Sequence, residues 1–305
     1  MAGMTRPIAL VGVPTALGGQ LPDGRHDGMA EVPLELRRRG LLERLREGGL
    51  EIRDDGDLAI DPPVRADPDR WAKNRALISE FLPREAAMVA AAVAGGERLL
   101  ILGGDCCAHA GAMAGLRRAR PERPLAIAWF DAHGDFNTPE TTPSGNTWGM
   151  PFAMLCGRGP DDLVGACEGP TVDERHAALI GGQVLDEPES RMLAASPIAH
   201  FGAGMVRTPA GMAGLAAWAT TVAGEVDGLY IAIDHDVLDA DEAAWAVTMP
   251  EPAGVPLATA IEAVRTLAAA MPVVGYGATA MNFAHGDGDR TVDAAARLAM
   301  TALAT

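Results

Sequence analysis

Six residues of metal-binding types stand at the ends of three apolar runs, and together they could hold two metal ions. The runs are RLLILGGDCC, PLAIAWFDAHGDFN and GLYIAIDHDVLD. Their polar ends supply one cysteine, one histidine and four aspartates: Cys106, Asp131, His133, Asp135, Asp234 and Asp236. Carboxylate oxygens suit hard divalent ions such as Mn²⁺, which also accepts imidazole. Because there are more carboxylates than one ion needs, the pattern indicates two ions that share aspartates.

The spacing of the acidic residues predicts that their side chains converge. Asp131, His133 and Asp135 occupy alternate positions after a strand-like run, and alternate side chains of an extended chain point the same way. Asp234 and Asp236 repeat this spacing after another run. A helix cap or a turn would explain either motif alone. Three such runs in one chain favour a metal site.

Two histidines near the expected site have open roles. His109 follows Cys106 by three residues on a predicted helix, so it either supports the site from behind or simply packs in the core. His235 lies between two of the aspartates and should point away from the metals, because neighbouring side chains of an extended chain alternate.

Strand-like runs alternate with helix-like runs along the whole chain. Because strands separated by helices form right-handed crossovers, this order predicts a parallel sheet with helices on both faces. In such sheets ligands bind beyond the carboxyl ends of the strands, where the three motifs stand. We expect one α/β domain over residues 1–305. The strands are expected at 7–14, 50–58, 98–105, 124–131, 176–182, 197–204, 228–234 and 272–281, and the longer helices at 31–49, 75–96, 106–120, 209–224, 256–272 and 291–304.

Composition restricts the partners. The 305 residues are 48% hydrophobic and carry a formal net charge of −16 with a pI near 4.8, so there is no basic footprint for nucleic acid. No apolar stretch is long enough to cross a membrane. The four cysteines have no disulfide-type spacing and no export signal precedes them, which predicts reduced thiols and a cytoplasmic location. The expected partner is a small molecule.

These motifs resemble a known family. The chain is similar to the arginase/ureohydrolase family of binuclear manganese hydrolases, which includes arginase, agmatinase and formimidoylglutamase. The similarity lies in VGVPTALGG, in DAHGDFNTPETTPSGN and in their order, and it covers nearly the whole chain. It implies a three-layer αβα fold with a mostly parallel sheet of about eight strands. It also implies two divalent ions, with Mn²⁺ favoured, and a guanidino or amidine substrate. The formation of a homo-oligomer is left open.

The resemblance also implies a role for each metal-type residue. Asp131 and Asp234 would bridge the two ions. Cys106 and Asp135 would complete one ion, and His133 and Asp236 would complete the other. The two ions would lower the pKa of a water molecule that attacks the guanidino carbon. Asp135 would then act as the catalytic acid that passes a proton to the departing nitrogen.

A second group of residues resembles the part of arginase that holds the α-amino and α-carboxylate ends of the substrate. These residues are Asn137, Thr142, Ser144 and Asn146 in one loop, followed by Asp186 and Glu189. Thr248 matches a family threonine near the guanidino group. The loop therefore implies a substrate with an amino-acid tail.

The chain departs from arginase at three positions. Cys106 replaces a metal-ligand histidine, and a thiolate there adds a negative charge and makes the metal a weaker Lewis acid. Trp148 replaces a histidine that shuttles protons, and could wall the pocket or pack in the core. Ala280 replaces the glutamate that holds the guanidinium. These departures resemble Cys-for-His family members that hydrolyse N-hydroxyarginine to ornithine and hydroxyurea.

Other substrates and one other class of protein stay open at this point. The alternative substrates are arginine, agmatine, a guanidino acid and a formimino amino acid. The alternative class is a non-catalytic relative that binds metal or a small ligand. Two ions per chain would favour hydrolysis, whereas none would favour the non-catalytic relative.

Overall fold

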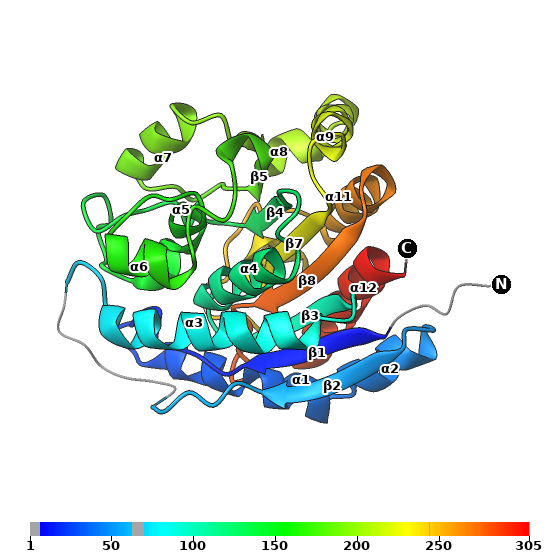
Figure 1. Cartoon of the computed structure of the whole chain (residues 1–305), viewed down its shortest axis with the longest axis horizontal. Coiled ribbons are helices and arrows are strands. Elements are labelled where there is room, and N and C mark those ends of the chain that lie inside the picture. The colour runs from blue at the N-terminus through cyan, green and yellow to red at the C-terminus, as the bar shows by residue number, and fades with distance from the viewer. Residues whose placement is uncertain (1–6, 63–69, 244, 305) are drawn as a thin grey trace.

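The computed structural model describes residues 7–62, 70–243 and 245–304. Eight strands form one sheet in the order β2-β1-β3-β8-β7-β4-β5-β6, and every neighbouring pair is parallel (Figure 1). The strands are β1 (Ile8–Val13), β2 (Ile52–Asp57), β3 (Arg98–Gly103), β4 (Ala126–Asp131), β5 (Ala177–Gly181), β6 (Ala199–Gly202), β7 (Leu229–Asp234) and β8 (Val273–Thr279). The expected parallel sheet is confirmed.

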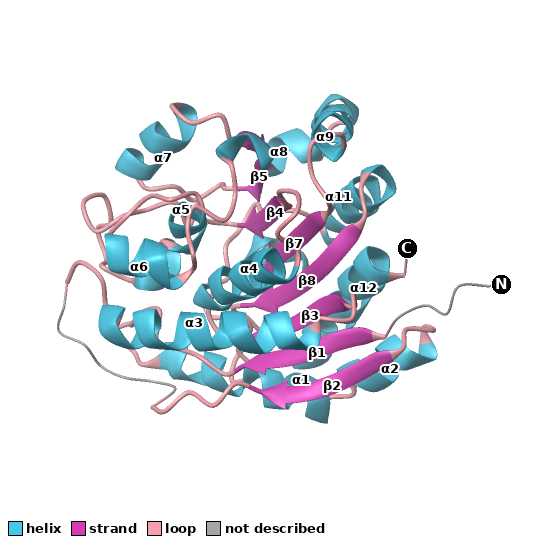
Figure 2. Cartoon of the chain, viewed as in Figure 1, coloured by secondary structure: helices cyan, strands magenta, loops and turns pink. Residues whose placement is uncertain are grey.

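Helices cover both faces of the sheet and give three layers, as Figure 2 shows. Strand residues alternate between two apolar cores, because successive side chains point to opposite faces: Ile8 and Leu10 enter one core, and Ala9 and Val11 enter the other. Against the second of these cores pack α3 (Arg75–Ala92), α4 (Cys107–Ala119), α5 (Pro151–Leu155), α6 (Asp161–Ala166) and α7 (Glu187–Ala194). Against the first pack α1 (Val32–Arg38), α2 (Leu41–Glu47), α8 (Ala203–Val206), α9 (Pro209–Ala223), α11 (Leu257–Ala270) and α12 (Gly288–Leu303).

The single helix expected over 31–49 is wrong. The chain forms α1 and α2 with a break between them, where Gly40 has a φ of 79°. Glycine adopts this left-handed conformation without the steric cost of a Cβ atom. The helical backbone is therefore interrupted at Gly40, although the apolar periodicity continues on both sides. The remaining elements are α10 (Ala240–Ala243) and four short 3₁₀ helices, η1 (Arg25–Glu31), η2 (Thr147–Gly149), η3 (Glu174–His176) and η4 (His235–Val237).

The four cysteines form no disulfide, and three of them are buried. Among the described residues, no helix is both long enough and apolar enough to cross a membrane.

The sheet order brings the three motifs together. Strands β3, β8, β7 and β4 are consecutive neighbours, so their carboxyl ends meet at one edge of the sheet. Gly104 follows β3 and approaches the backbone of Thr15 so closely that a Cβ atom would overlap the Thr15 carbonyl oxygen. The glycine pair after β3 therefore lets the N-terminal loop and the cysteine motif share this edge.

Candidate metal centre

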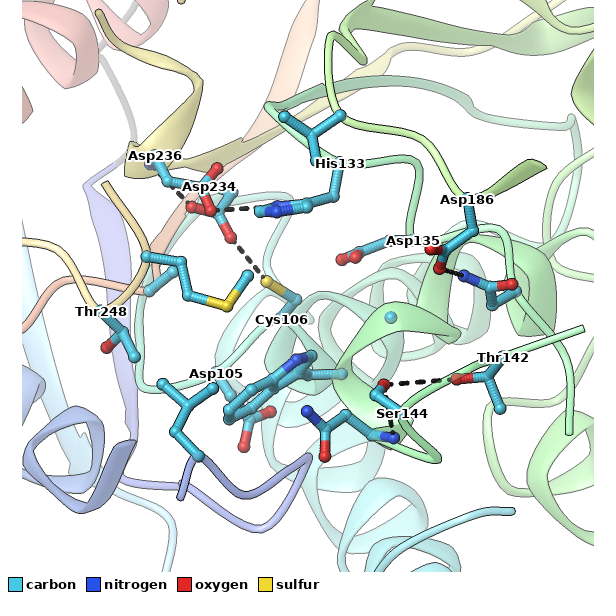
Figure 3. A pocket seen from close by; sticks show the side chains of 18 of the residues that line it. Asp105, Cys106, His133, Asp135, Thr142, Ser144, Asp186, Asp234, Asp236 and Thr248 are labelled. Atoms are coloured by element: carbon cyan, nitrogen blue, oxygen red, sulfur yellow. Dashed lines mark hydrogen bonds and ion pairs between the residues drawn. The ribbon is translucent and has the colours of Figure 1, made fainter. Parts of the chain in front are cut away.

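A pocket of about 290 Å³ opens at this edge of the sheet. Every residue that the sequence predicts as a metal, catalytic or substrate contact lines the pocket except Asp131, which is fully buried beneath it. The lining also includes an apolar set that sequence reasoning did not select: Leu21, Met29, Pro143, Val184 and Met249. Figure 3 shows the metal-type residues on one side of the pocket and the polar loop with Asp186 on the other.

The metal-type side chains form two overlapping groups. Ligand atoms of Cys106, Asp131 and Asp135 lie within 4.8 Å of one another, and those of Asp131, His133 and Asp236 do the same. Asp131 belongs to both groups, which is the position that a bridging ligand would need. Asp234 joins the first group through its Oδ2 atom, which accepts a hydrogen bond from the Cys106 thiol at 2.9 Å.

The convergence does not arise from an extended chain, so the predicted alternation is wrong as an explanation. Strand β4 ends at Asp131, whose Oδ1 atom accepts the backbone N–H of His133 at 2.7 Å. Asp135 then adopts a left-handed φ of 48°. Asp234 likewise accepts the N–H of Asp236 at 2.8 Å, which opens η4. Each aspartate thus folds its own motif into a turn, since its short carboxylate reaches the backbone two residues ahead.

Charge in this cluster is not balanced by the protein. Four carboxylates and one thiol share the site with a single imidazole, and all four aspartates are at most 4% exposed. Burial, together with repulsion from neighbouring carboxylates, raises the pKa of Asp135 and of Asp234 well above the usual range. Burial and the nearby Asp234 also raise the pKa of Cys106. One carboxylate oxygen of Asp135 is buried without a hydrogen-bond partner among the described residues. Divalent cations would supply the missing charge and a partner for this oxygen, so the donor set fits them.

Neighbouring groups orient two of the candidate ligands. The Nδ1 atom of His133 lies 3.4 Å from Asp131 and 3.2 Å from Asp236, while its Nε2 atom faces Glu251 at 3.7 Å. A carboxylate behind the imidazole fixes which nitrogen faces a metal. The indole N–H of Trp129 donates to Asp131 Oδ2 at 3.0 Å. Glu251 was not predictable because it contacts His133 from a loop far along the chain. Trp129 lies only two residues before Asp131 on β4, where strand alternation places both side chains on the same face.

The opposite wall of the pocket carries the polar loop. Asn137 donates from Nδ2 to Asp186 at 2.9 Å, and the hydroxyl groups of Thr142 and Ser144 lie 3.4 Å apart. Asn146 accepts hydrogen bonds at Oδ1 from Lys73 Nζ at 2.6 Å and from a backbone N–H at 3.0 Å. These contacts place several amide and hydroxyl groups on one side of the cavity.

Glu189 has a structural role that the sequence did not reveal. Its carboxylate accepts the backbone N–H groups of Phe136 at 2.9 Å and of Asp186 at 3.2 Å, and so links the metal loop to the start of α7. Burial raises its pKa to about 7. A Cβ atom at Gly134 would approach the Glu189 carboxylate to 2.6 Å, so glycine is needed for this close packing. Glu189 also reaches the pocket, where binding of substrate remains a prediction.

Ala280 and Thr248 also line the pocket. Ala280 adopts a left-handed φ of 62°, held by a hydrogen bond from its N–H to the Gly104 carbonyl at 2.7 Å. The Thr248 hydroxyl is buried with no partner among the described residues, so it is free to bind a ligand. Trp148 lines the pocket, is partly buried, and packs against Gly18 and Gly19.

Asp105 is a pocket residue that the sequence reasoning did not select. Its Oδ1 atom accepts the N–H of Cys107 at 2.9 Å at the start of α4, and its Oδ2 atom accepts the N–H of Gly18 at 2.8 Å. An aspartate directly before a predicted helix is a recognisable capping signal. Asp105 therefore fixes the backbone on both sides of Cys106 and ties it to the N-terminal loop.

Comparison with known proteins places this architecture among characterised relatives. The model of the arginase family matches residues 6–305. Arginase from Bacillus caldovelox is 32% identical over 248 residues, which cover 78% of this chain and 78% of the relative. Rat arginase-1 is 33% identical over 205 residues, which cover 66% of this chain and 61% of the relative. The crystal structure of Bacillus caldovelox arginase superposes with a TM-score of 0.88 at 30% identity, over 98% of this chain and 99% of that one.

Proposed function

Because the chain belongs to the arginase family, we propose that it hydrolyses the guanidino C–N bond of an arginine-like amino acid, with N-hydroxyarginine as its best substrate. Family membership confirms the expected enzyme class, since members are metal-dependent hydrolases of amidine C–N bonds. With N-hydroxyarginine, water is added across the bond to the δ-nitrogen, and the products are ornithine and hydroxyurea.

One observation carries the choice of substrate: the pocket combines a polar wall suited to an amino-acid tail with an alanine where a cation would need a carboxylate. Asn137 and Ser144 belong to the polar wall, and Ala280 lines the same cavity. A guanidinium ion next to a methyl group lacks a charge partner, whereas the less basic N-hydroxyguanidine does not depend on one to the same degree. The polar wall argues against agmatine, which has no carboxylate.

The protein's own residues would divide the work as follows. Asn137, Ser144 and Asn146 bind the tail, and Asp186 orients Asn137. The Thr248 hydroxyl binds the hydroxyguanidine group. When bound, the two divalent ions supply a water of lowered pKa as the nucleophile. Asp135 receives a proton and passes it to the departing δ-nitrogen, a role open to a buried carboxylate with one oxygen that has no hydrogen-bond partner among the described residues.

The metals are proposed to be held by the six residues at the strand ends. The family depends on a binuclear metal site. Mn²⁺ is the proposed metal because carboxylates dominate the donor set, although Cys106 also suits softer ions such as Co²⁺, Fe²⁺ and Zn²⁺. A cytoplasmic location and a small-molecule partner belong to the same proposal.

A substrate panel tests the proposal. The purified protein is loaded with Mn²⁺ and supplied separately with N-hydroxyarginine, arginine, agmatine, a guanidino acid and a formimino amino acid, and the amine products are quantified. We expect the highest kcat/KM with N-hydroxyarginine and the next highest with arginine. A preference for agmatine or arginine would overturn the substrate assignment while leaving the enzyme class intact.

A further inference from the structure

A chain of buried polar side chains runs away from Cys106 into the sheet. The Cys106 sulfur contacts the Thr279 hydroxyl at 3.8 Å, and Thr279 contacts His109 Nε2 at 3.1 Å. The other ring nitrogen, Nδ1, contacts the Tyr230 hydroxyl at 2.8 Å. Thr279, His109 and Tyr230 are all fully buried, and none of the three lines the pocket. They therefore cannot act on a substrate directly.

The donors and acceptors among these side chains allow only one direction for the hydrogen bonds between them. The Thr279 hydroxyl donates to the Ile233 carbonyl at 3.4 Å. Because Thr279 has one proton and gives it to this carbonyl, its contact with His109 requires Nε2 to be the donor, so the imidazole proton lies on Nε2 and Nδ1 is the acceptor. The Tyr230 hydroxyl then donates to Nδ1, and Nε2–H faces Thr279. Thr279 receives this hydrogen bond, and a thiolate at the Cys106 sulfur would compete with the Ile233 carbonyl for the Thr279 proton.

The surrounding residues leave room for this chain. A Cβ atom at Gly277 would overlap the Tyr230 hydroxyl and would lie 2.8 Å from the His109 ring. A Cβ atom at Gly103 would lie 2.7 Å from Thr279. The His109 ring also packs edge-on against Trp129, with ring centroids 5.1 Å apart. Two glycines and an aromatic ring thus hold the three side chains in place.

We infer that Thr279 is a positioning residue that donates a hydrogen bond to the Cys106 thiolate when a metal is bound, with His109 and Tyr230 aligning its hydroxyl. This inference rests on the proposed metal centre, because a thiolate exists there only as a metal ligand. In the metal-free protein the Cys106 thiol donates to Asp234 instead. Once Asp234 and the sulfur both face a cation, the thiolate has no proton of its own, and the neighbouring hydroxyl is the donor within reach.

A hydrogen bond to a thiolate is charge-assisted and stronger than one between neutral groups. It would lower the energy of the sulfur lone pairs and reduce the electron density that the sulfur gives to the metal. It would also fix the rotamer of Cys106. Loss of such a supporting contact typically weakens metal binding about 10- to 100-fold. Thr279 would thus offset part of the effect of a thiolate at a position where the family has an imidazole.

Cobalt substitution gives a direct readout. The wild-type protein loaded with Co²⁺ should show a sulfur-to-cobalt charge-transfer band in the near ultraviolet that Cys106→Ser abolishes. Thr279→Val keeps the shape of the side chain but removes the hydroxyl, so the band should move to longer wavelength and Co²⁺ affinity should fall about tenfold or more. Thr279→Ser keeps the hydroxyl and should restore both properties. Tyr230→Phe removes the hydroxyl group that donates to His109. It should move the band in the same direction but by a smaller amount.

Tyr276→Phe is the matched control. Tyr276 is also on β8 and buried, but its hydroxyl has no hydrogen-bond partner among the described residues, so its removal should leave the spectrum unchanged. If Thr279→Val and Thr279→Ser gave the wild-type band and affinity, the inference would be wrong although the metal centre stands. If Thr279→Val does not fold, an unshifted band in Tyr230→Phe overturns it instead. A wild-type protein without the charge-transfer band would refute the metal role of Cys106, and this inference with it.

Discussion

Replacing Ala280 with glutamate should turn the pocket towards a cationic guanidinium. The Ala280 side chain faces the cavity and is 7% exposed, and the backbone there is held in the left-handed region by hydrogen bonds to Gly104 and Thr248. Left-handed backbone is unfavourable for any residue with a Cβ atom, so alanine and glutamate carry a similar cost. The substitution therefore changes the charge and size of the pocket without adding backbone strain.

The expected magnitude follows from the burial of the position. A charge-assisted hydrogen bond in a desolvated site contributes about 1.5–3 kcal/mol. If the contact persists in the transition state, this corresponds to a gain of roughly 10- to 100-fold in kcat/KM for arginine. The hydroxyguanidine group of N-hydroxyarginine is less basic, so the new carboxylate should add little to its binding. Crowding by the larger side chain should lower the turnover of this substrate. A new carboxylate beside Cys106 and Asp234 also adds repulsion, so the free variant should be less stable than wild type.

Ala280→Gln separates charge from size, because glutamine has the same shape as glutamate without the charge. The assay is ornithine release from arginine and from N-hydroxyarginine for wild type and both variants, with the ratio of the two kcat/KM values as the readout. Ala280→Glu should shift this ratio towards arginine, and Ala280→Gln should not. Equal ratios in the two variants would refute the idea that a missing carboxylate sets the substrate.

Three further predictions concern the metal centre. Asp131→Asn should abolish binding of both ions, because Asp131 belongs to both ligand groups, whereas Asp135→Asn should retain one; metal analysis of the purified variants decides, and one ion in Asp131→Asn would contradict its shared position. Cys106→His removes a negative charge from the metals, so the rising limb of the pH–rate profile should move to lower pH, and an unchanged limb would mean that the thiolate does not control the nucleophile. Without metal, burial and repulsion raise the pKa values of Asp135 and Asp234 above their unfolded values, so these two groups should lower the stability as pH rises from the unfolded towards the raised folded values. Thermal unfolding in chelator and in Mn²⁺ measures this loss, and a flat pH dependence in chelator would argue against it.

The fold was predictable because its signals are local and repeated. All eight strands lie within the predicted ranges, since each is an apolar run bounded by turn residues. The break at Gly40 was missed because apolar periodicity continues on both sides of it, and only the backbone angle reveals the turn. The short helices α5, α6 and α7 were missed for another reason. They are only 5, 6 and 8 residues long, and packing rather than periodicity defines them.

The location of the site was predictable, but its supporting contacts were not. The metal-type residues could be grouped from the sequence because parallel strands place their carboxyl ends at one edge of the sheet. The mechanism of convergence was misjudged, because Asp131 and Asp234 bend their own motifs through hydrogen bonds to backbone N–H groups. Thr279 and Glu251 contact Cys106 and His133 from elements far along the chain. Such contacts depend on side-chain geometry across strands, which spacing within one motif does not encode.

The departures at positions 106 and 280 have a common electrostatic meaning. A site with a neutral imidazole ligand and a glutamate would carry four aspartate charges and one further negative charge at the substrate tip. If Cys106 binds metal as a thiolate and Ala280 faces the guanidino group, the formal total would be the same, but the fifth charge would lie at the metal site. Loss of the negative charge beside the guanidino group would weaken the binding of a cationic substrate. A negative charge gained at the metal site would make the bound water less acidic and the ions weaker Lewis acids. Both effects disfavour a resonance-stabilised guanidinium and are better tolerated by a less basic N-hydroxyguanidine. The two substitutions should therefore be coupled, and Cys106→His without a carboxylate at position 280 should improve the nucleophile but leave arginine poorly bound.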